Sequence, residues 1–543
     1  MLVSGATLGG GSGVVKRREE LAMPKKPRRA KPTTARKPPI PPRAKKSVQA
    51  GEGYRPEALR SELIVTLRPG VADATARLEA AVRSVRSLRS AAGSLVTLLF
   101  GTRAQLERRT AALRERGIDA PDLSRFYQVA AREEDYDDII AAVRELDIVE
   151  RVERKPPADA PYGAPATTTP YSCQETVCCP CCWAPKKTPD FSSRQYYLDR
   201  ATGGVDARHA WTKPGGRGDR VIIVDIERAW RFTHEDLVGP GGIAGVPLGG
   251  APIDCIRERN HGTAVLGMLT GNSKNAIGVT GICPNATVRG YSTRTPGMPQ
   301  NQIPGTANTS QAIYAATVAL TNDYADLNTG HILLLELQRI DPDGYNIAVE
   351  WWLQDFLAIQ DATACGLIVV AAAGNGHVTR LEGADLDHPR YDAAPQNPFR
   401  CAASGARVAD SGSILIGAGA PPLGTPRVDR SRLTFSNYGT CVDVQGWGQE
   451  VVTTGYGCLQ GGPDEDRWYM GDFGGTSSAS AMIAGVLACV QGHYRATGRA
   501  PLDSKGARTL LQGGGSPQMD DGPLYPAATQ KIGPRPNLRQ LVP

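Results

Sequence analysis

The sequence predicts an α/β protein whose main sheet is largely parallel with helices on both faces, preceded by a smaller α/β unit. Apolar strand-like runs alternate with amphipathic helical segments over residues 196–500, as in parallel sheets covered by helices. The chain is 41% hydrophobic and 22% charged, which is usual for a soluble globular protein. No run reaches the roughly eighteen apolar residues that a membrane-spanning helix needs.

Residues 1–52 are predicted to form a disordered, basic, proline-rich arm. Residues 25–46 contain ten Lys or Arg and no acidic residue, and their prolines disfavour helix and sheet. Without these ten charges the net charge of +7 becomes −3, so the basic character belongs to the arm. We expect a solvated arm, and binding to nucleic acid, an anionic membrane or another anionic polymer is the alternative.

The first fifteen residues make a poor signal peptide, because they lack a basic stretch followed by a sustained apolar one. Both a cytoplasmic location and export by an unrecognised route therefore stay open.

Residues 53–156 are predicted to form the small α/β unit. Its helix, over 135–146, places Ile139, Ile140, Val143 and Leu146 on one face. Its strands are expected at 63–67, 95–100, 126–131 and 148–153. A linker rich in Cys and Pro is expected at 157–195.

Residues 196–500 are predicted to form the main domain, followed by a C-terminal extension over 501–543. The expected strands are 221–225, 332–337, 367–373 and 414–417. The expected helices are 261–270, 308–320, 347–365 and 477–494. Because sites in such sheets form at the carboxyl ends of the strands, polar residues at those ends are the first candidates.

Three polar residues have the settings that nucleophilic catalysis needs. Asp225 ends an apolar strand, and His261 and Ser477 are expected at the starts of helices. A serine hydroxyl needs a base to take its proton, and a histidine needs a carboxylate to fix its tautomer. We therefore predict a triad of Asp225, His261 and Ser477.

A fourth residue, Asn375, follows the buried strand that ends at Gly374. Its side chain is predicted to donate a hydrogen bond to a tetrahedral oxyanion, together with the backbone N–H of Ser477. Singly, each of these motifs is an ordinary turn or loop signal, but their combination in the order Asp, His, Asn, Ser favours catalysis.

The motifs Asn260–His261–Gly262–Thr263 and Gly474–Gly475–Thr476–Ser477 resemble those of the subtilase family, whose triad has the order Asp, His, Ser. The resemblance covers about residues 200–495. It implies a subtilisin-like serine endopeptidase that hydrolyses protein or peptide substrates through an acyl-enzyme. The alternative is an inactive pseudoprotease that binds peptides.

The same resemblance suggests that the small unit at 53–156 is a propeptide-like domain, with an unrelated accessory domain as the alternative. Cutting of the chain is then expected between about 155 and 195. The family needs no cofactor for its chemistry, and structural calcium is possible.

The sequence departs from the family pattern near the site. Ile226 and Glu227 replace the small hydroxyl residue and glycine that usually follow the aspartate, and Ala481 replaces a usual proline. The predicted substrate groove consists of Glu336, Leu337, Gln338 and Gly374. A glutamate in place of the usual small residue at 336 suggests a preference for basic side chains in the substrate.

The acidic and cysteine clusters have ordinary explanations as well as metal-binding ones. Acidic loops are the candidates for calcium, although a solvated turn is the preferred interpretation; they contain Asp341, Asp343, Asp464, Glu465 and Asp466. A zinc site is weakly suggested by closely spaced cysteines, for which disulfides or a flexible linker are preferred: Cys173, Cys178, Cys179, Cys181 and Cys182. Cys441 and Cys458 are a candidate disulfide pair.

Overall fold

The structure is a computed structural model that describes residues 61–71, 74–159, 184–238, 247–252, 255–294, 308–380, 382–393, 400–401 and 407–543. The predicted basic arm and the cysteine cluster of the linker lie outside these residues. Among the residues that are described, no helix combines the length and apolar character needed to cross a bilayer.

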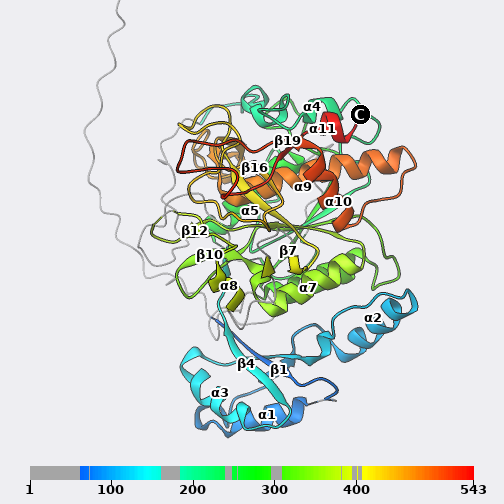
Figure 1. The fold of residues 1–543 in the computed structure, drawn as a ribbon, viewed down its shortest axis with the longest axis vertical. Coiled ribbons are helices and arrows are strands. Elements are labelled where there is room, and N and C mark those ends of the chain that lie inside the picture. The colour runs from blue at the N-terminus through cyan, green and yellow to red at the C-terminus, as the bar shows by residue number, and fades with distance from the viewer. Residues whose placement is uncertain are drawn as a thin grey trace, which may run out of the picture. The chain divides into compact units, whose positions relative to one another are not determined.

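A four-stranded antiparallel sheet forms the core of the N-terminal unit, with strand order β2-β3-β1-β4. Its strands are β1 (Glu62–Leu67), β2 (Val96–Leu98), β3 (Phe126–Val129) and β4 (Val149–Lys155). The helices α1 (Thr75–Ser84) and α3 (Tyr136–Arg144) bury Leu78, Val82, Ile139 and Val143 against it. These elements lie together in Figure 1. The four strands and α3 agree with the prediction, whereas α1 was not predicted.

The helix α2 (Arg103–Glu115) was also not predicted, because six of its thirteen residues are charged and its apolar stripe is short. Its start is fixed by a capping box, in which Thr102 accepts from the Gln105 N–H and the Gln105 side chain accepts from the Thr102 N–H. Leu106 and Leu113 then pack in the same core as Ala312 and Ile313 of the main domain. This helix therefore joins the N-terminal unit to the rest of the protein.

The main sheet has six strands in the order β16-β15-β11-β8-β6-β7, and every pairing in it is parallel. The strands are β6 (Ile222–Glu227), β7 (Thr287–Ser292), β8 (Ile332–Leu335), β11 (Ile368–Ala372), β15 (Ile414–Gly419) and β16 (Val444–Trp447). Four of the strands are those predicted. The expected strand 332–337 ends two residues early, at Leu335.

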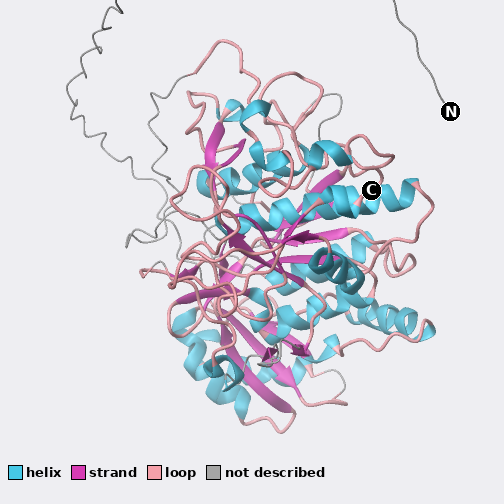
Figure 2. Ribbon diagram, turned by 45° about the horizontal axis from the view of Figure 1, so that its top comes forward, coloured by secondary structure: helices cyan, strands magenta, loops and turns pink. Residues whose placement is uncertain are grey.

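Helices cover both faces of this sheet, as predicted, and Figure 2 shows the strands between them. Successive side chains of a strand point to opposite faces. Ile223, Ile332 and Leu334 therefore pack on one side, with α5 (Ile256–Thr270) and α9 (Gly475–Ala496). Val224, Leu333 and Leu335 pack on the other side, with α6 (Thr309–Leu320) and α7 (Leu353–Ala364).

A second sheet, in the order β12-β10-β9-β5, lies beyond the end of β8 and was not predicted. It consists of β5 (Ala158–Asp159), β9 (Gln338–Ile340), β10 (Tyr345–Ala348) and β12 (Gly376–His377). The expected helix 347–365 accordingly begins only at Leu353, because the residues before it form β10 and a short 3₁₀ turn. The sheet brings the end of the N-terminal unit to the residues predicted to line the groove.

The C-terminal residues are part of the main core. The helices α10 (Ser504–Gly513) and α11 (Leu538–Leu541) bury Leu511, Leu538 and Val542 in the same cluster as α9. The hairpin β17 (Val451–Thr454) and β18 (Tyr469–Phe473) precedes α9.

Candidate active site

The candidate site lies where β6, α5 and α9 meet. Asp225 and Glu227 point to the same face of β6 because they are two residues apart, and this is the face that packs on α5 and α9. Ser477 lies in the first turn of α9, after Gly475, whose φ of +89° favours glycine. His261 lies in the second turn of α5 and not at the helix start, since the helix begins five residues earlier than expected.

The hydrogen bonds connect Ser477, His261 and Glu227 in a chain. The His261 Nε2 lies 2.9 Å from the Ser477 Oγ. The His261 Nδ1 lies 2.7 Å and 2.9 Å from the two carboxylate oxygens of Glu227. All three side chains are fully buried. The carboxylate fixes the imidazole with Nδ1 as the donor, so that Nε2 can accept the serine proton.

The sequence predicts that Asp225 binds His261, but the Nδ1 of His261 binds Glu227 in the structure. The Asp225 Oδ2 instead accepts a hydrogen bond of 2.7 Å from the Trp230 Nε1. Glu227 is two residues nearer the carboxyl end of the strand, about 7 Å further along, and has a longer side chain. It therefore reaches the imidazole from the last position of β6. The prediction that Asp225 binds His261 is wrong, and Asp225 is a neighbouring buried acid.

Asn375 contacts Thr476, the residue before Ser477, and its role toward an oxyanion stays a prediction. Its Oδ1 accepts hydrogen bonds of 2.9 Å from the backbone N–H and from the hydroxyl of Thr476. Its own N–H donates to the Gln338 Oε1 at 2.9 Å. Because the Oδ1 faces Thr476, the amide has one orientation, with its donor Nδ2 on the opposite side. Gly374 precedes it with a φ of +99°, and a Cβ there would lie 2.4 Å from the Asn346 carbonyl oxygen.

The other predicted groove residues have different settings. Leu337 is buried in the core between the sheet and α7, and Gln338 begins β9. Glu336 is fully buried, and carboxylate or imidazole atoms of Glu336, Glu227 and His261 all lie within 4.8 Å of one another. The Glu336 side chain thus lies beside the Glu227–His261 pair, not on an accessible surface where a basic substrate side chain would meet it.

Burial controls the ionisation of the acids at the site. It raises the pKa of Asp225 well above the ordinary value, and the nearby Glu227 adds to this. It likewise raises the pKa of Glu227, with a further increase from Glu258 and an opposing effect of Arg228. The pKa of Glu336 is raised by burial and then by Asp225 and Glu227. Ionisation of one of these acids therefore disfavours ionisation of the others.

Glu227, His261 and Glu336 are the one cluster in the described part of the chain with the donor atoms for a metal ion. A metal bound there would have to replace the hydrogen bonds between Glu227 and His261. The acidic loops proposed for calcium are engaged by the chain itself. Ion pairs join Arg390 to Asp343 at 3.1 Å and Arg231 to Asp466 at 3.2 Å.

The cysteines that the structure describes fall into two groups. Cys441 and Cys458 each take part in a disulfide, while their pairing with one another stays a prediction. Free and buried thiols are found at Cys255, Cys283, Cys365 and Cys489.

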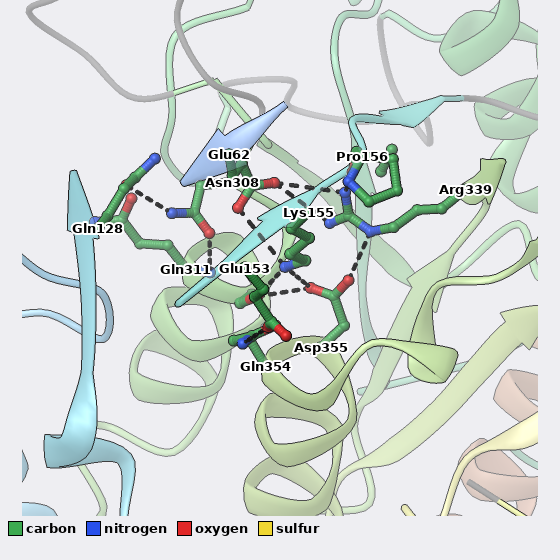
Figure 3. A network of polar contacts seen from close by, with 12 residues as sticks. Glu62, Gln128, Glu153, Lys155, Pro156, Asn308, Gln311, Arg339, Gln354 and Asp355 are labelled. Carbon is green, nitrogen blue, oxygen red and sulfur yellow. Dashed lines mark hydrogen bonds and ion pairs between the residues drawn. The ribbon is translucent and has the colours of Figure 1, made fainter. Parts of the chain in front are cut away.

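The N-terminal unit contacts the main domain through buried charges (Figure 3). The Lys155 Nζ lies 2.7 Å from the Asp355 Oδ1, and Arg339 binds the other oxygen of Asp355 at 2.8 Å. Glu62 of β1 faces Lys155 at 3.7 Å and Arg339 at 3.4 Å. All four side chains are fully buried. From this network the chain continues into β5, where Ala158 pairs with Arg339.

Sequence reasoning missed the role of Glu227, although the departure from the family pattern after Asp225 was its signal. The acid that binds His261 is the last residue of β6, and in this sequence that residue is Glu227. Trp230, which binds Asp225, and Thr476, which orients Asn375, had no sequence signal.

Comparisons with known proteins agree with this architecture. Residues 251–511 match the model of the subtilase family. A thermophilic serine proteinase from Bacillus sp. (strain AK1) is 27% identical over 290 residues, 53% of this chain and 56% of the relative. Subtilisin BL from Lederbergia lenta is 27% identical over 51% of this chain and 77% of its own length.

The chain spans about half the length of several of the curated relatives that it matches. A solved protease structure from Pseudoalteromonas arctica is 18% identical, with a TM-score of 0.42 over 66% of this chain and 99% of that one. Residues 251–511 therefore resemble the subtilase family, and the parallel α/β architecture is consistent with a subtilisin-like fold.

Proposed function

We propose that the protein is a serine endopeptidase whose triad is Ser477, His261 and Glu227. The observation that carries the proposal is the continuous hydrogen-bonded chain from the Ser477 Oγ through both imidazole nitrogens to the Glu227 carboxylate. In this mechanism the Ser477 Oγ attacks the peptide carbonyl while the His261 Nε2 takes its proton. Glu227 accepts the Nδ1–H and stabilises the imidazolium that forms.

The second half of the reaction uses the same groups. The imidazolium gives its proton to the leaving amine, which departs and leaves an acyl-enzyme on Ser477. His261 then takes a proton from water, which attacks the ester, and returns that proton to the Ser477 Oγ as the acid product leaves. The Nδ2 of Asn375 and the Ser477 N–H are the proposed donors to the oxyanion in both steps. The chemistry needs no metal or cofactor, in keeping with the subtilase family.

We further propose that residues 53–156 act as a propeptide-like domain on this site. The support is β5, which adds a strand to β9 directly after the predicted groove residues 336–338. A peptide substrate that binds by strand addition would compete with β5 for the same edge. Cutting after β5, within the predicted interval of about 155–195, would allow the strand to leave.

The full-length protein and its Ser477→Ala variant test both proposals together. We expect wild-type protein to digest an unfolded protein substrate, to react with a serine-directed fluorophosphonate, and to yield a new N-terminus between 155 and 195. The S477A variant is expected to lose about 10⁶ in turnover and to lose the labelling. Thr476→Ser, which changes the neighbouring side chain but keeps a hydroxyl, is the control.

Each outcome has a separate meaning. Labelled but unprocessed wild-type protein would reject the propeptide and keep the peptidase. Wild-type protein that is neither labelled nor active would instead indicate a peptide-binding pseudoprotease. Undiminished digestion by S477A would reject Ser477 as the nucleophile.

A further inference from the structure

Four acids are buried near His261 in the part of the chain that the structure describes. Asp225 and Glu227 lie on β6, Glu258 lies one turn before His261 on α5, and Glu336 follows β8; all four are fully buried. Arg228 is the cation beside them, and its Nη1 lies 3.3 Å from the Glu258 Oε1. Isolated ionised carboxylates are costly to bury, so a group without a partner takes up a proton instead.

The hydrogen bonds indicate which acids carry the charge. Glu227 receives the Nδ1–H of His261, Glu258 faces Arg228, and Asp225 receives the Trp230 N–H. Neither carboxyl oxygen of Glu336 has a hydrogen-bond partner in the part of the chain that the structure describes. Donors favour the charged form of a carboxyl group, so the acid with none is the one that keeps its proton.

We propose that Glu336 is a positioning residue that stays protonated beside Glu227, so that one negative charge, on Glu227, faces His261 during the reaction. This rests on the triad proposed above, because Glu336 acts through Glu227. Its neutral carboxyl group adds no second negative charge next to Glu227 and His261, with which it shares the 4.8 Å cluster.

The proposal assigns a direction to the pH dependence. While Glu336 is neutral, the imidazole loses its proton readily and serves as a base. When Glu336 ionises at higher pH, a second negative charge favours the imidazolium, which no longer accepts the Ser477 proton. Since burial, Asp225 and Glu227 all raise the pKa of Glu336, this loss falls on the alkaline side of the activity profile. Arg228 and Glu258 face the same space and are unchanged in every variant below.

Infrared spectroscopy of the full chain tests the proton itself, in the S477A background to prevent self-digestion. At neutral pH we expect the carbonyl absorption of a protonated carboxylic acid, shifted in heavy water. Glu336→Gln is expected to remove absorption at this position. Asp225→Asn is the matched control, since it alters an acid of the same cluster and spares Glu336. An absorption unchanged by E336Q, or absent at neutral pH from the S477A parent, would overturn the proposal even if the protein proved not to be a peptidase.

Kinetics on the otherwise wild-type enzyme test the consequence. Glu336→Ala should lower kcat about tenfold to a hundredfold, with little change in KM, because Glu227 and His261 lose the side chain that lies beside them and can shift from the productive geometry. E336Q, which fills the same space and cannot ionise, should recover most of that loss and should lack the alkaline decline. An E336Q enzyme that keeps the alkaline decline and changes only its preference for substrate side chains would show that Glu336 determines specificity, which contradicts the proposal.

Discussion

At the scale of single residues, the Asn375 amide is held in one orientation before any substrate binds. Thr476 donates twice to its Oδ1, and Gln338 accepts its backbone N–H. Such preorganisation matters because a donor that is already aimed at the developing charge needs no reorganisation during the reaction. The residue next to the nucleophile thus orients the group proposed to stabilise the oxyanion.

Replacing Asn375 by Ala should lower kcat by about 10²–10³ and change KM much less, since the lost donor acts mainly in the transition state. Thr476→Val is the matched variant: it removes the hydroxyl donor to Asn375 and keeps the backbone one, so its loss should be smaller. Steady-state kinetics on a chromogenic peptide measure both. A kcat for N375A equal to that of wild type would exclude Asn375 from the oxyanion site.

Three of the four proposed site residues were predicted from the sequence, and the exception has a physical reason. His261, Asn375 and Ser477 stand in local motifs whose spacing is set by helix starts and strand ends. Asp225 and Glu227 share a face of β6. The tertiary position of α5 decides which of these two carboxyl groups lies within hydrogen-bond distance of the imidazole. The burial of Glu336 beside Glu227 could not be predicted for the same reason, because it depends on tertiary packing.

At the scale of elements, α2 provides a second attachment of the N-terminal unit besides β5. The Arg109 Nε lies 2.5 Å from the Asp361 Oδ1 of α7, and both side chains are buried. The Tyr324 hydroxyl donates to the other oxygen of Asp361 at 2.9 Å. The preceding residue, Arg108, forms an exposed ion pair of 3.0 Å with Asp323. Of two adjacent arginines in one helix, Arg109 thus forms a buried ion pair and Arg108 an exposed one.

Arg109→Met should destabilise the full chain by about 3–5 kcal/mol, because Asp361 stays buried without its cation. Arg108→Met should cost less than about 1 kcal/mol, since exposed pairs contribute little. Urea unfolding in the S477A background measures both, and it keeps the N-terminal unit attached. Equal shifts in the unfolding midpoint for the two variants would contradict a buried contact of α2 with α7.

The elements that sequence patterns predicted are those with long apolar runs. The strands β6, β8, β11 and β15 are buried on both faces and therefore read as continuous apolar stretches. The short strands β5, β9, β10 and β12 form because distant segments pair, and two to four residues carry too little pattern to show it. The charged helix α2 was not predicted because its buried side is set by its packing on the main domain and not by a long apolar stripe.

At the scale of the whole molecule, the six-stranded parallel sheet places the proposed catalytic groups at one end. Glu227 ends β6, Asn375 follows β11, and Glu336 follows β8. The strand order β11-β8-β6 makes these three strands neighbours, so their carboxyl ends bring the three side chains together. α5 and α9, on one face of the sheet, supply His261 and Ser477.

The arrangement also explains why two acids so close together have different roles. The last position of β6 faces His261, whereas the position two residues earlier lies under Trp230. The central claim is therefore that the proposed peptidase uses Glu227, and not Asp225, to orient its histidine.

The most direct measurement is kcat/KM for Glu227→Gln beside Asp225→Asn. Both substitutions replace a buried carboxyl by its amide without a change in size. We expect E227Q to lose about 10⁴ in kcat, because the imidazole is no longer held in the required tautomer. D225N should lose less than about tenfold, since its amide oxygen still accepts from Trp230. A loss of about 10⁴ in D225N, with E227Q close to wild type, would contradict the account and restore Asp225 to the triad.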